Sequence, residues 1–422
     1  MCKTIREILL QPLHYNYFTY STRDLTVKSH LGCTLSSSDT PLQRKKTPNS
    51  RKYIQITLEV VFMIAILAGL LYYIGTTVPS TFKPGEMTIL RGVDYIYTTV
   101  LTIKIEFLLL AFLMYFGINV LFAVRLRRVL SKNGVKTSFG KTLLAQYAGM
   151  LTSDVTPGRS GYILTPVYLR DQDVPASKGL SSVLGIQTFE FLIKVVGGIG
   201  AVILLVTTVP PSTWDNVFKH VQIAGVNAGL LIAVLGISLM AVGAALLAAF
   251  TWSKRAISIF DKIANSRYLK RFTGGIMGKL EEYKESSSST SKAIPEIVGL
   301  TFSCWVLKGF EWWFLGYALG ISQLTWTWWL AFFLIHPLVT ALAFIPITPA
   351  GIGVQEFGIV GILGLLGVAA PIAGVFALLA RGLLIFEDLA GVPQIVKSTS
   401  LIFSRKKPNE TTLPPPLMIP SP

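Results

Sequence analysis

Residues 179–207 read GLSSVLGIQTFEFLIKVVGGIGAVILLVT, an apolar stretch whose only charged residues are Glu190 and Lys194. A helix needs about 20 predominantly apolar residues to cross the hydrocarbon core of a bilayer. This stretch exceeds that length, so it predicts a membrane-spanning helix. The two charges predict contact with something other than lipid tails, because ionisable side chains are costly in hydrocarbon.

The same apolar character extends along most of the chain. Of its 422 residues, 51% are hydrophobic and 14% are charged, whereas a soluble domain carries about 25% charged residues. This excludes a soluble enzyme and predicts an all-α, polytopic helical membrane protein with about six to eight transmembrane helices. The clear spans are predicted at 55–74, 103–124, 179–207, 223–250, 294–318 and 371–396.

The two ends of the chain differ from this apolar body. The first 52 residues are polar, and the end of the chain is rich in proline, so neither can bury enough apolar area to fold alone. We predict a flexible cytoplasmic N-terminal segment at 1–52, a transmembrane domain at 53–398 and a disordered cytoplasmic tail at 399–422.

The net charge of +16 is distributed in a way that argues against a nucleic-acid partner. Lys and Arg are frequent in 1–55 (nine), 125–141 (six), 251–292 (nine) and 397–422 (four), and scarce in 75–102 (two), 208–221 (one) and 319–325 (none). Positively charged loops stay on the cytoplasmic side of a membrane. The alternation therefore predicts a multi-pass plasma-membrane protein whose termini and 251–292 segment are cytoplasmic.

Two further regions, 138–172 and 326–367, are apolar but broken by Pro and Gly. The predicted sidedness requires each to return to the side where it started, so each is either a re-entrant hairpin or a pair of crossings. The breaks are similar, reading TPGRSG at 156–161 and TPAGIG at 348–353. Matching breaks in two halves of a transporter are typical of its binding site. Either an inverted repeat or a chance coincidence of short motifs explains the likeness. An inverted repeat predicts that the two breaks approach each other near mid-membrane.

Several ionisable residues fall inside the predicted spans, and each is a candidate functional residue. Glu190 and Lys194 have the i,i+4 spacing that places them on one helix face, together with Gln187. Lys308 and Glu311 are three residues apart and are predicted to form a structural ion pair.

The last predicted span carries Arg381 and Asp388 on one face, with Glu387 offset from them. His336, directly before a proline, is predicted to be a helix-packing residue rather than a proton relay. No cofactor or metal is predicted, because the three cysteines are scattered. The common hydrolase, ATPase and dinucleotide-binding motifs are absent, so the sequence favours a protein that is not an enzyme.

The chain resembles a known family at PGRSG (157–161), Leu169-Arg170, Phe189-Glu190, PAGIGVQE (349–356) and Arg381. The family is the flippase-like membrane region of lysylphosphatidylglycerol synthases, which also occurs as stand-alone proteins in archaea and bacteria, and the resemblance covers about residues 55–396. The chain departs from the family pattern at Tyr162, where many members have Glu. It also departs at Lys194, where an acidic residue is common. These departures concern the lipid substrate and not the fold.

The resemblance implies a helical fold with re-entrant elements and a role in moving or handling lipids. In the bifunctional members, this region is associated with flipping aminoacylated phosphatidylglycerol, and a separate soluble domain transfers lysine from its tRNA. The sequence has no region resembling that domain, so lysyl transfer is not expected.

A headgroup phosphate cannot cross hydrocarbon without a polar cavity, and arginine is its natural partner. We expect Arg159 and Arg381 to line one cavity, Glu190 and Glu356 to hold the arginines or engage a headgroup amine, and helix N-termini after both breaks to donate N–H groups. The predicted substrate-binding residues are Arg159, Glu190, Lys194, Glu356, Arg381, Gly158, Gly161, Gly351 and Gly353. The expected ligand is an anionic phospholipid or a polyprenyl-phosphate-linked lipid.

Three functions are compatible with these features. The first is an ATP-independent translocase of such a lipid. The second is a membrane enzyme, or an accessory subunit of lipid or glycolipid modification that has a membrane-bound glycosyltransferase or synthase as its partner. The third is a scaffold whose polar residues are purely structural.

Overall fold

The computed structural model describes residues 50–79, 81–156, 159–217, 222–223, 226–253, 277–321, 324–344, 348 and 351–404. The predicted terminal segments 1–52 and 399–422 lie mostly outside these ranges. The elements in chain order, with η denoting 3₁₀ helices, are α2 (Ser50–Thr77), α3 (Thr88–Leu101), α4 (Ile105–Lys132), α5 (Phe139–Ser153), η1 (Ser160–Leu164), α6 (Thr165–Tyr168), η2 (Arg170–Gln172), α7 (Ala176–Thr208), α8 (Pro211–Val217), β1 (Gln222–Ile223), β2 (Val226–Asn227), α9 (Ala228–Trp252), α12 (Met277–Ser291), α13 (Ile294–Ala318), α14 (Trp328–Ala343), α15 (Val354–Leu365), α16 (Ala370–Asp388), η3 (Leu389–Gly391) and α17 (Val392–Ser404).

The fold is that of an all-α helical membrane protein, as predicted. Within the described ranges, α4 and α7 are long and apolar enough to cross a membrane, and α13 joins them if it forms one span with Glu285–Ser291, from which it is bent by 62°. The outer faces of the long helices carry exposed apolar side chains such as Leu113, Val196 and Leu246. Such a surface suits contact with lipid tails rather than with water.

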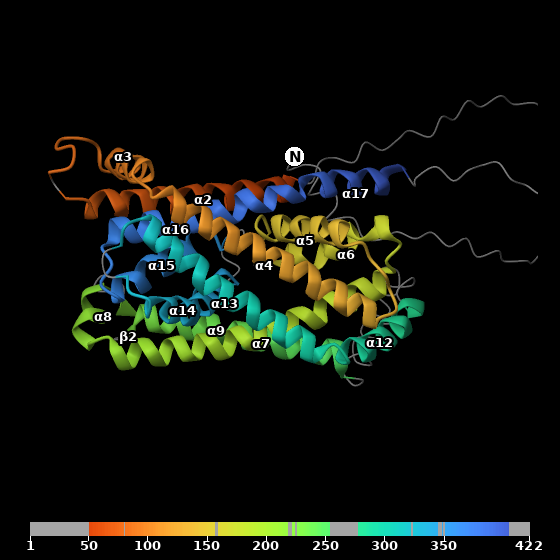
Figure 1. Cartoon of the computed structure of the whole chain (residues 1–422). Coiled ribbons are helices and arrows are strands. Elements are labelled where there is room, and N and C mark those ends of the chain that lie inside the picture. Colours follow the sequence, from red (N-terminus) through yellow and green to blue (C-terminus); the bar gives the residue numbers. More distant parts are fainter. Residues whose placement is uncertain are drawn as a thin grey trace, which may run out of the picture.

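The long helices run in roughly the same direction, with α2 and α16 along one side and α7 and α9 along the other (Figure 1). Between them, α4 and α13 pack against each other along their length. The main hydrophobic core joins these elements through Leu70 of α2, Tyr115 of α4, Leu205 of α7, Trp312 of α13 and Phe376 of α16. The polar residues described below therefore lie inside a bundle whose core is apolar and whose outer surface carries apolar side chains.

The helix connections gather at two ends of the bundle. The connections containing α3 and α8 lie at one end, and α12 and α17 lie at the other (Figure 1). The first end holds the segments that are poor in Lys and Arg, and the second holds segments that are rich in them. The structure thus groups the connections as the charge alternation requires, while the cytoplasmic identity of the second end stays a prediction.

The two predicted hairpins are helix–break–helix elements that start from opposite ends of the bundle (Figure 1). In the first, α5 has 15 residues and is followed, after the break, by η1 and the four-residue α6. In the second, α14 has 16 residues and α15 has 12. All are shorter than the roughly 20 residues that a crossing needs. The lengths favour re-entrant hairpins over paired crossings.

The span predicted at 371–396 is not one helix. It divides into α16 and α17, which are separated by η3. At this division the backbone of Gly391 packs against the backbone of Tyr147 and Ala148 in α5, and a Cβ atom there would collide with both.

The connection after α2 also contains more structure than the sequence predicts. Its helix α3 folds back on α2, and the two backbones touch at Gly75 and Gly92, where neither position has room for a Cβ atom. The Nη2 atom of Arg91 donates to the carbonyl oxygens of Gly75 and Val78, each at 3.0 Å. This bonding satisfies carbonyl groups that would otherwise be unpaired at the C-terminus of α2.

Candidate functional site

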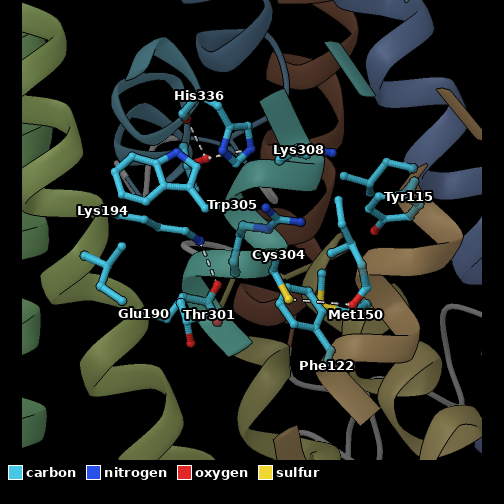
Figure 2. Close-up of a pocket in the computed structure, with 15 residues that line it drawn as sticks. Tyr115, Phe122, Met150, Glu190, Lys194, Thr301, Cys304, Trp305, Lys308 and His336 are labelled. Atoms are coloured by element: carbon cyan, nitrogen blue, oxygen red, sulfur yellow. Dashed lines mark hydrogen bonds and ion pairs between the residues drawn. The ribbon is translucent and has the colours of Figure 1, made fainter. Parts of the chain in front are cut away.

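A cavity lies inside the bundle between α4, α7, α13 and α14, with Arg159 and residues of α5 and α16 completing its wall. The space, open surroundings included, is about 640 Å³. Figure 2 shows that α7, α13 and α4 each contribute both polar and apolar side chains. Its polar and charged lining consists of Tyr115, Arg159, Glu190, Lys194, Thr301, Lys308, His336 and Thr340. A cavity with this lining can hold a charged group within the membrane-spanning region.

Glu190 is bound by two cations from different helices. Its Oε1 atom accepts from Nζ of Lys194 at 2.7 Å, as the i,i+4 spacing on α7 predicts, and its Oε2 atom accepts from Nη2 of Arg125 at 3.0 Å. Arg125 also donates to Oγ1 of Thr301 at 2.6 Å and lies 4.6 Å from the ring centroid of Phe122. One carboxylate therefore neutralises only one of two positive charges.

Arg159, at the first break, forms an ion pair with Asp154. Its Nη2 atom donates to Oδ1 of Asp154 at 2.7 Å, and Oγ of Ser153 donates to its main-chain oxygen at 2.9 Å. Its backbone is left-handed, with φ of 55°, which costs an L-residue about 1–2 kcal/mol. These contacts with the end of α5 compensate for the strain and fix the guanidinium at the cavity wall.

Gly161 is a packing residue of the first break rather than a lining residue of the cavity. Its N–H donates to Oγ1 of Thr156 at 2.6 Å, and a Cβ atom at this position would collide with the backbone of Thr152. The break thus folds back onto the last turn of α5. The other predicted glycine of this break, Gly158, lies outside the described residues.

The second break holds a separate charged cluster. Oε1 of Glu356 accepts from Nε of Arg381 at 2.7 Å, and Oε2 accepts from the N–H of Gly353 at 2.5 Å. Nη2 of Arg381 donates to Oε1 of Gln355 at 2.7 Å. Neither of the two cavities described here is lined by Arg381 or Glu356. Arg159 lines both of them, whereas the donors of Arg381 are directed at the start of α15. That the two arginines line one cavity stays a prediction.

Two of the N–H donors near the helix N-termini, those of Gly161 and Gly353, are already bound by side chains. The first break leads into η1, which is a 3₁₀ helix, and the second leads into α15, whose preceding N–H at Gly353 is already bound by Glu356. Gly351 and Gly353 have φ of 69° and 87°, and a Cβ atom at Gly351 would collide with Ala343 of α14. Both glycines therefore serve the chain reversal.

The end of α14 and the first break share a second, smaller cavity of about 340 Å³. It is lined by Ser153 of α5, by Arg159 of the first break and by Phe344, which follows α14. Glu190 and Lys194 line it as well. The chain just before the second break thus shares a cavity with Arg159, and whether the two breaks meet stays a prediction.

Lys308 and His336 line the main cavity from α13 and α14. Nζ of Lys308 lies 2.7 and 2.6 Å from the two carboxylate oxygens of Glu311, which is the predicted ion pair, and 4.6 Å from the ring centroid of Tyr115. The His336 ring packs edge-on against Trp312, with centroids 5.2 Å apart, and its Nε2 atom is 3.3 Å from Oγ1 of Thr340. The packing role predicted for His336 agrees with these contacts.

Three residues of the site were missed from the sequence. Arg125 was counted with the cytoplasmic tract 125–141, but α4 continues to Lys132 and buries it. Asp154 could have been found as the acid five residues before Arg159. Tyr115, whose O–H donates to Oδ2 of Asp388 at 3.0 Å, carries no signal among the apolar residues of its span.

The comparisons with known proteins bear on the whole of this region. The family model described as the lysylphosphatidylglycerol synthase TM region matches residues 60–387. The chain belongs to this family. The match includes both breaks and all residues that line the two cavities. Neither a curated protein nor a solved structure matches the chain.

Membership of the lysylphosphatidylglycerol synthase TM family makes this a membrane protein tied to lipid modification or translocation. Within the described ranges, no group of three or more His, Cys, Asp or Glu residues could hold a metal ion. The basic side chains that line the cavity, Arg159, Lys194 and Lys308, can bind an anion there.

Proposed function

We propose that the cavity binds the phosphate-bearing headgroup of an anionic membrane lipid and provides its path across the bilayer. The ligand is an anionic phospholipid or a polyprenyl-phosphate-linked lipid. The family match supports a lipid-related role. The observation that carries the proposal is that Glu190 is shared by Arg125 and Lys194.

The charge of the cavity fits a single phosphodiester. Arg159 is paired with Asp154 and Lys308 with Glu311, so each of these pairs is neutral. The cluster formed by Glu190, Arg125 and Lys194 keeps one excess positive charge. An uncompensated charge inside a bundle is expensive, and a phosphodiester carries the one negative charge that would balance it.

Lys194 and Arg159 are the cations that can reach this phosphate. Their side chains are 17% and 13% exposed, whereas that of Arg125 is 1% exposed. Hydrogen bonds between charged groups are the strong ones in proteins. We therefore assign phosphate binding to Lys194 and Arg159, and the fixing of Glu190 to Arg125.

The test is lipid retention, measured by native mass spectrometry of the purified chain and its Lys194→Met variant. Loss of one charge-assisted hydrogen bond, about 1.5–3 kcal/mol, predicts retention of anionic lipid reduced about 10- to 100-fold. Lys132→Met is the matched control, because Lys132 is also ion-paired, to Glu296, but is 44% exposed outside the cavity. Equal retention in both variants would contradict the proposal.

Transfer of a fluorescent anionic lipid between leaflets of proteoliposomes tests the movement itself. Lys194→Met is expected to slow transfer, and Lys132→Met is expected to leave it unchanged. A covalently altered lipid recovered from the vesicles would instead identify the chain as an enzyme of lipid modification.

We further propose that the protein lies in the plasma membrane with the α12 and α17 end of the bundle in the cytoplasm. The positive charge at that end supports this orientation. In a variant without native cysteines, a cysteine at Asn216 should react with an impermeant thiol reagent added outside intact cells. A cysteine at Glu285 should react only after permeabilisation, and the opposite pattern would reverse the orientation.

A further inference from the structure

Cations outnumber acids among the side chains that line the main cavity. The cations are Arg159, Lys194 and Lys308, and the acid is Glu190. The acids that pair with Arg159 and Lys308 are buried behind them and do not line the cavity; they are Asp154 and Glu311. A ligand in this cavity therefore meets one carboxylate among the residues that the structure describes.

That carboxylate already binds two cations of the protein. Oε1 of Glu190 accepts from Lys194 at 2.7 Å, and Oε2 accepts from Arg125 at 3.0 Å. An ammonium group of a ligand would be the third cation at this carboxylate, and like charges brought together at a binding site are unfavourable. The alternative left open by the sequence, that Glu190 engages a headgroup amine, would require the ligand to displace one of these two bonds.

Two aromatic rings of the cavity wall also serve cations of the protein. The guanidinium of Arg125 lies 4.6 Å from the ring centroid of Phe122, and Nζ of Lys308 lies 4.6 Å from that of Tyr115. An aromatic ring can bind an ammonium group over its face. At Phe122 and Tyr115, such a group would again be placed beside a charge of the same sign.

The remaining polar side chains of the wall suit hydroxyl groups. Thr301, His336 and Thr340 contribute hydroxyl and imidazole groups, which both donate and accept hydrogen bonds, as a ligand hydroxyl does. Trp305 adds a flat apolar surface near Lys194 and His336 (Figure 2). Its ring is held in place by stacking on Phe333, with centroids 4.3 Å apart, and by an N–H bond to the main-chain oxygen of Phe333.

We propose that the cavity selects phosphate lipids whose headgroup carries an uncharged, hydroxyl-bearing group beyond the phosphate, either glycerol or a sugar, and discriminates against headgroups that carry an amine. This inference rests on the proposed function, because it takes the phosphate to be bound by Lys194 and Arg159. The hydroxyl-bearing group then lies toward Trp305, His336 and Thr340.

The charge balance supports this selectivity. The cluster of Glu190, Arg125 and Lys194 has one excess positive charge, and the phosphodiester supplies the one negative charge that balances it. No negative charge of the described lining then remains to pair with an ammonium group. Phosphatidylserine is the sharpest comparison, because it has the same net charge as phosphatidylglycerol but carries an amine.

The test is a competition for the purified full chain, read by native mass spectrometry. The chain is offered equal amounts of phosphatidylglycerol, phosphatidylserine and lysylphosphatidylglycerol. We expect phosphatidylglycerol to be retained at least about tenfold over each of the other two. Equal retention of phosphatidylglycerol and phosphatidylserine would overturn the selectivity and leave the proposed function intact. Retention of none of these lipids would overturn both.

A charge reversal at Lys194 should reverse the preference. In Lys194→Glu the cluster contains two carboxylates and Arg125, so lysylphosphatidylglycerol should be retained over phosphatidylglycerol. Lys132→Glu is the matched control, because Lys132 is ion-paired to Glu296 but is 44% exposed outside the cavity, and it should keep the wild-type preference. This control also separates the cavity from general attraction of anionic lipids to a basic protein.

Lys194→Met keeps the test decisive if Lys194→Glu does not fold. It removes the excess positive charge without adding a carboxylate, so the preference for phosphatidylglycerol over lysylphosphatidylglycerol should fall about tenfold. A wild-type preference in Lys194→Met would show that this charge does not select the headgroup and would overturn the inference.

A second competition distinguishes the two sources of the hydroxyl-bearing group. Phosphatidylglycerol, a polyprenyl-phosphate hexose and phosphatidylserine are offered together in equal amounts. Preferential retention of phosphatidylglycerol would assign glycerol, and preferential retention of the polyprenyl lipid would assign a sugar, each in agreement with the inference. Displacement of both by phosphatidylserine would overturn it.

Discussion

The two breaks have similar sequences but direct their charges to different places. At 156–161, Arg159 bonds an acid of its own break and lines the cavity. At 348–353, the chain reversal is followed by Glu356, which bonds the N–H of Gly353 and the side chain of Arg381. The first break therefore places its cation at the cavity wall, whereas Arg381 pairs with the acid that binds the backbone of the second break. Similar sequence does not imply equal function.

The largest expected difference concerns removal of each arginine. Arg381→Leu leaves Glu356, which is 2% exposed, as a buried charge without its cation, and should cost about 3–5 kcal/mol. Arg159→Leu should cost less than half of this, because Arg159 lines the cavity, where water can take the place of its guanidinium. Thermal unfolding in detergent measures both. Equal losses would mean that the two arginines have the same structural role.

The next difference concerns the glycines that reverse the chain. Gly351→Ala should cost about 2–4 kcal/mol, because it combines a collision with α14 with an unfavourable φ. Gly161→Ala should cost about 1–3 kcal/mol, because it produces only the collision with α5.

Gly140→Ala is the control for these variants, since it lies in α5 with open space around it. It should stabilise the helix by about 0.5–1 kcal/mol. If Gly161→Ala and the control Gly140→Ala unfold at the same midpoint, the first break is loosely packed.

The sequence could predict the apolar spans, because each is long and its neighbours differ in charge. It could also predict the pairs Glu190–Lys194 and Lys308–Glu311, because their spacing on one helix is sufficient to bring them together. Glu356 was expected to hold an arginine, and it bonds Arg381. The sequence could not predict that Glu190 holds Arg125, because that contact depends on how α4 packs against α7, and spacing along the chain contains no information about it.

The same reason explains why the division between α16 and α17 was missed. The residues from 371 to 396 are apolar enough for one helix. The division lies at η3, where Gly391 contacts α5, which is distant in sequence. Arg125 was missed because positive residues near a span end usually mark a loop, whereas here α4 continues past it.

A smaller difference is expected at the two threonines that begin the breaks. Oγ1 of Thr156 accepts from the N–H of Gly161, while Oγ1 of Thr348 is buried and has no partner among the residues that the structure describes. Thr156→Val should therefore cost about 1–3 kcal/mol, since it leaves an N–H unsatisfied. Thr348→Val should be neutral or slightly stabilising. If both variants unfold at the wild-type temperature, the bond at Gly161 does not hold the first break.

The smallest stability effects are expected for replacement of each arginine by lysine. These two variants should differ in lipid binding instead. Arg381→Lys keeps the charge beside Glu356 and loses the bond to Gln355, which should cost about 1 kcal/mol. Because Arg381 does not line either described cavity, lipid retention should be unchanged.

Arg159→Lys should have an equally small effect on stability, because a lysine can still pair with Asp154. It loses the planar fork of donors that lets arginine bond a carboxylate and a phosphate at once. A loss of one such bond, about 1.4 kcal/mol, corresponds to a tenfold reduction in retained anionic lipid. Native mass spectrometry and unfolding measured on the same two samples separate the effects. Reduced retention in Arg381→Lys but not in Arg159→Lys would move the phosphate from the first break to the second.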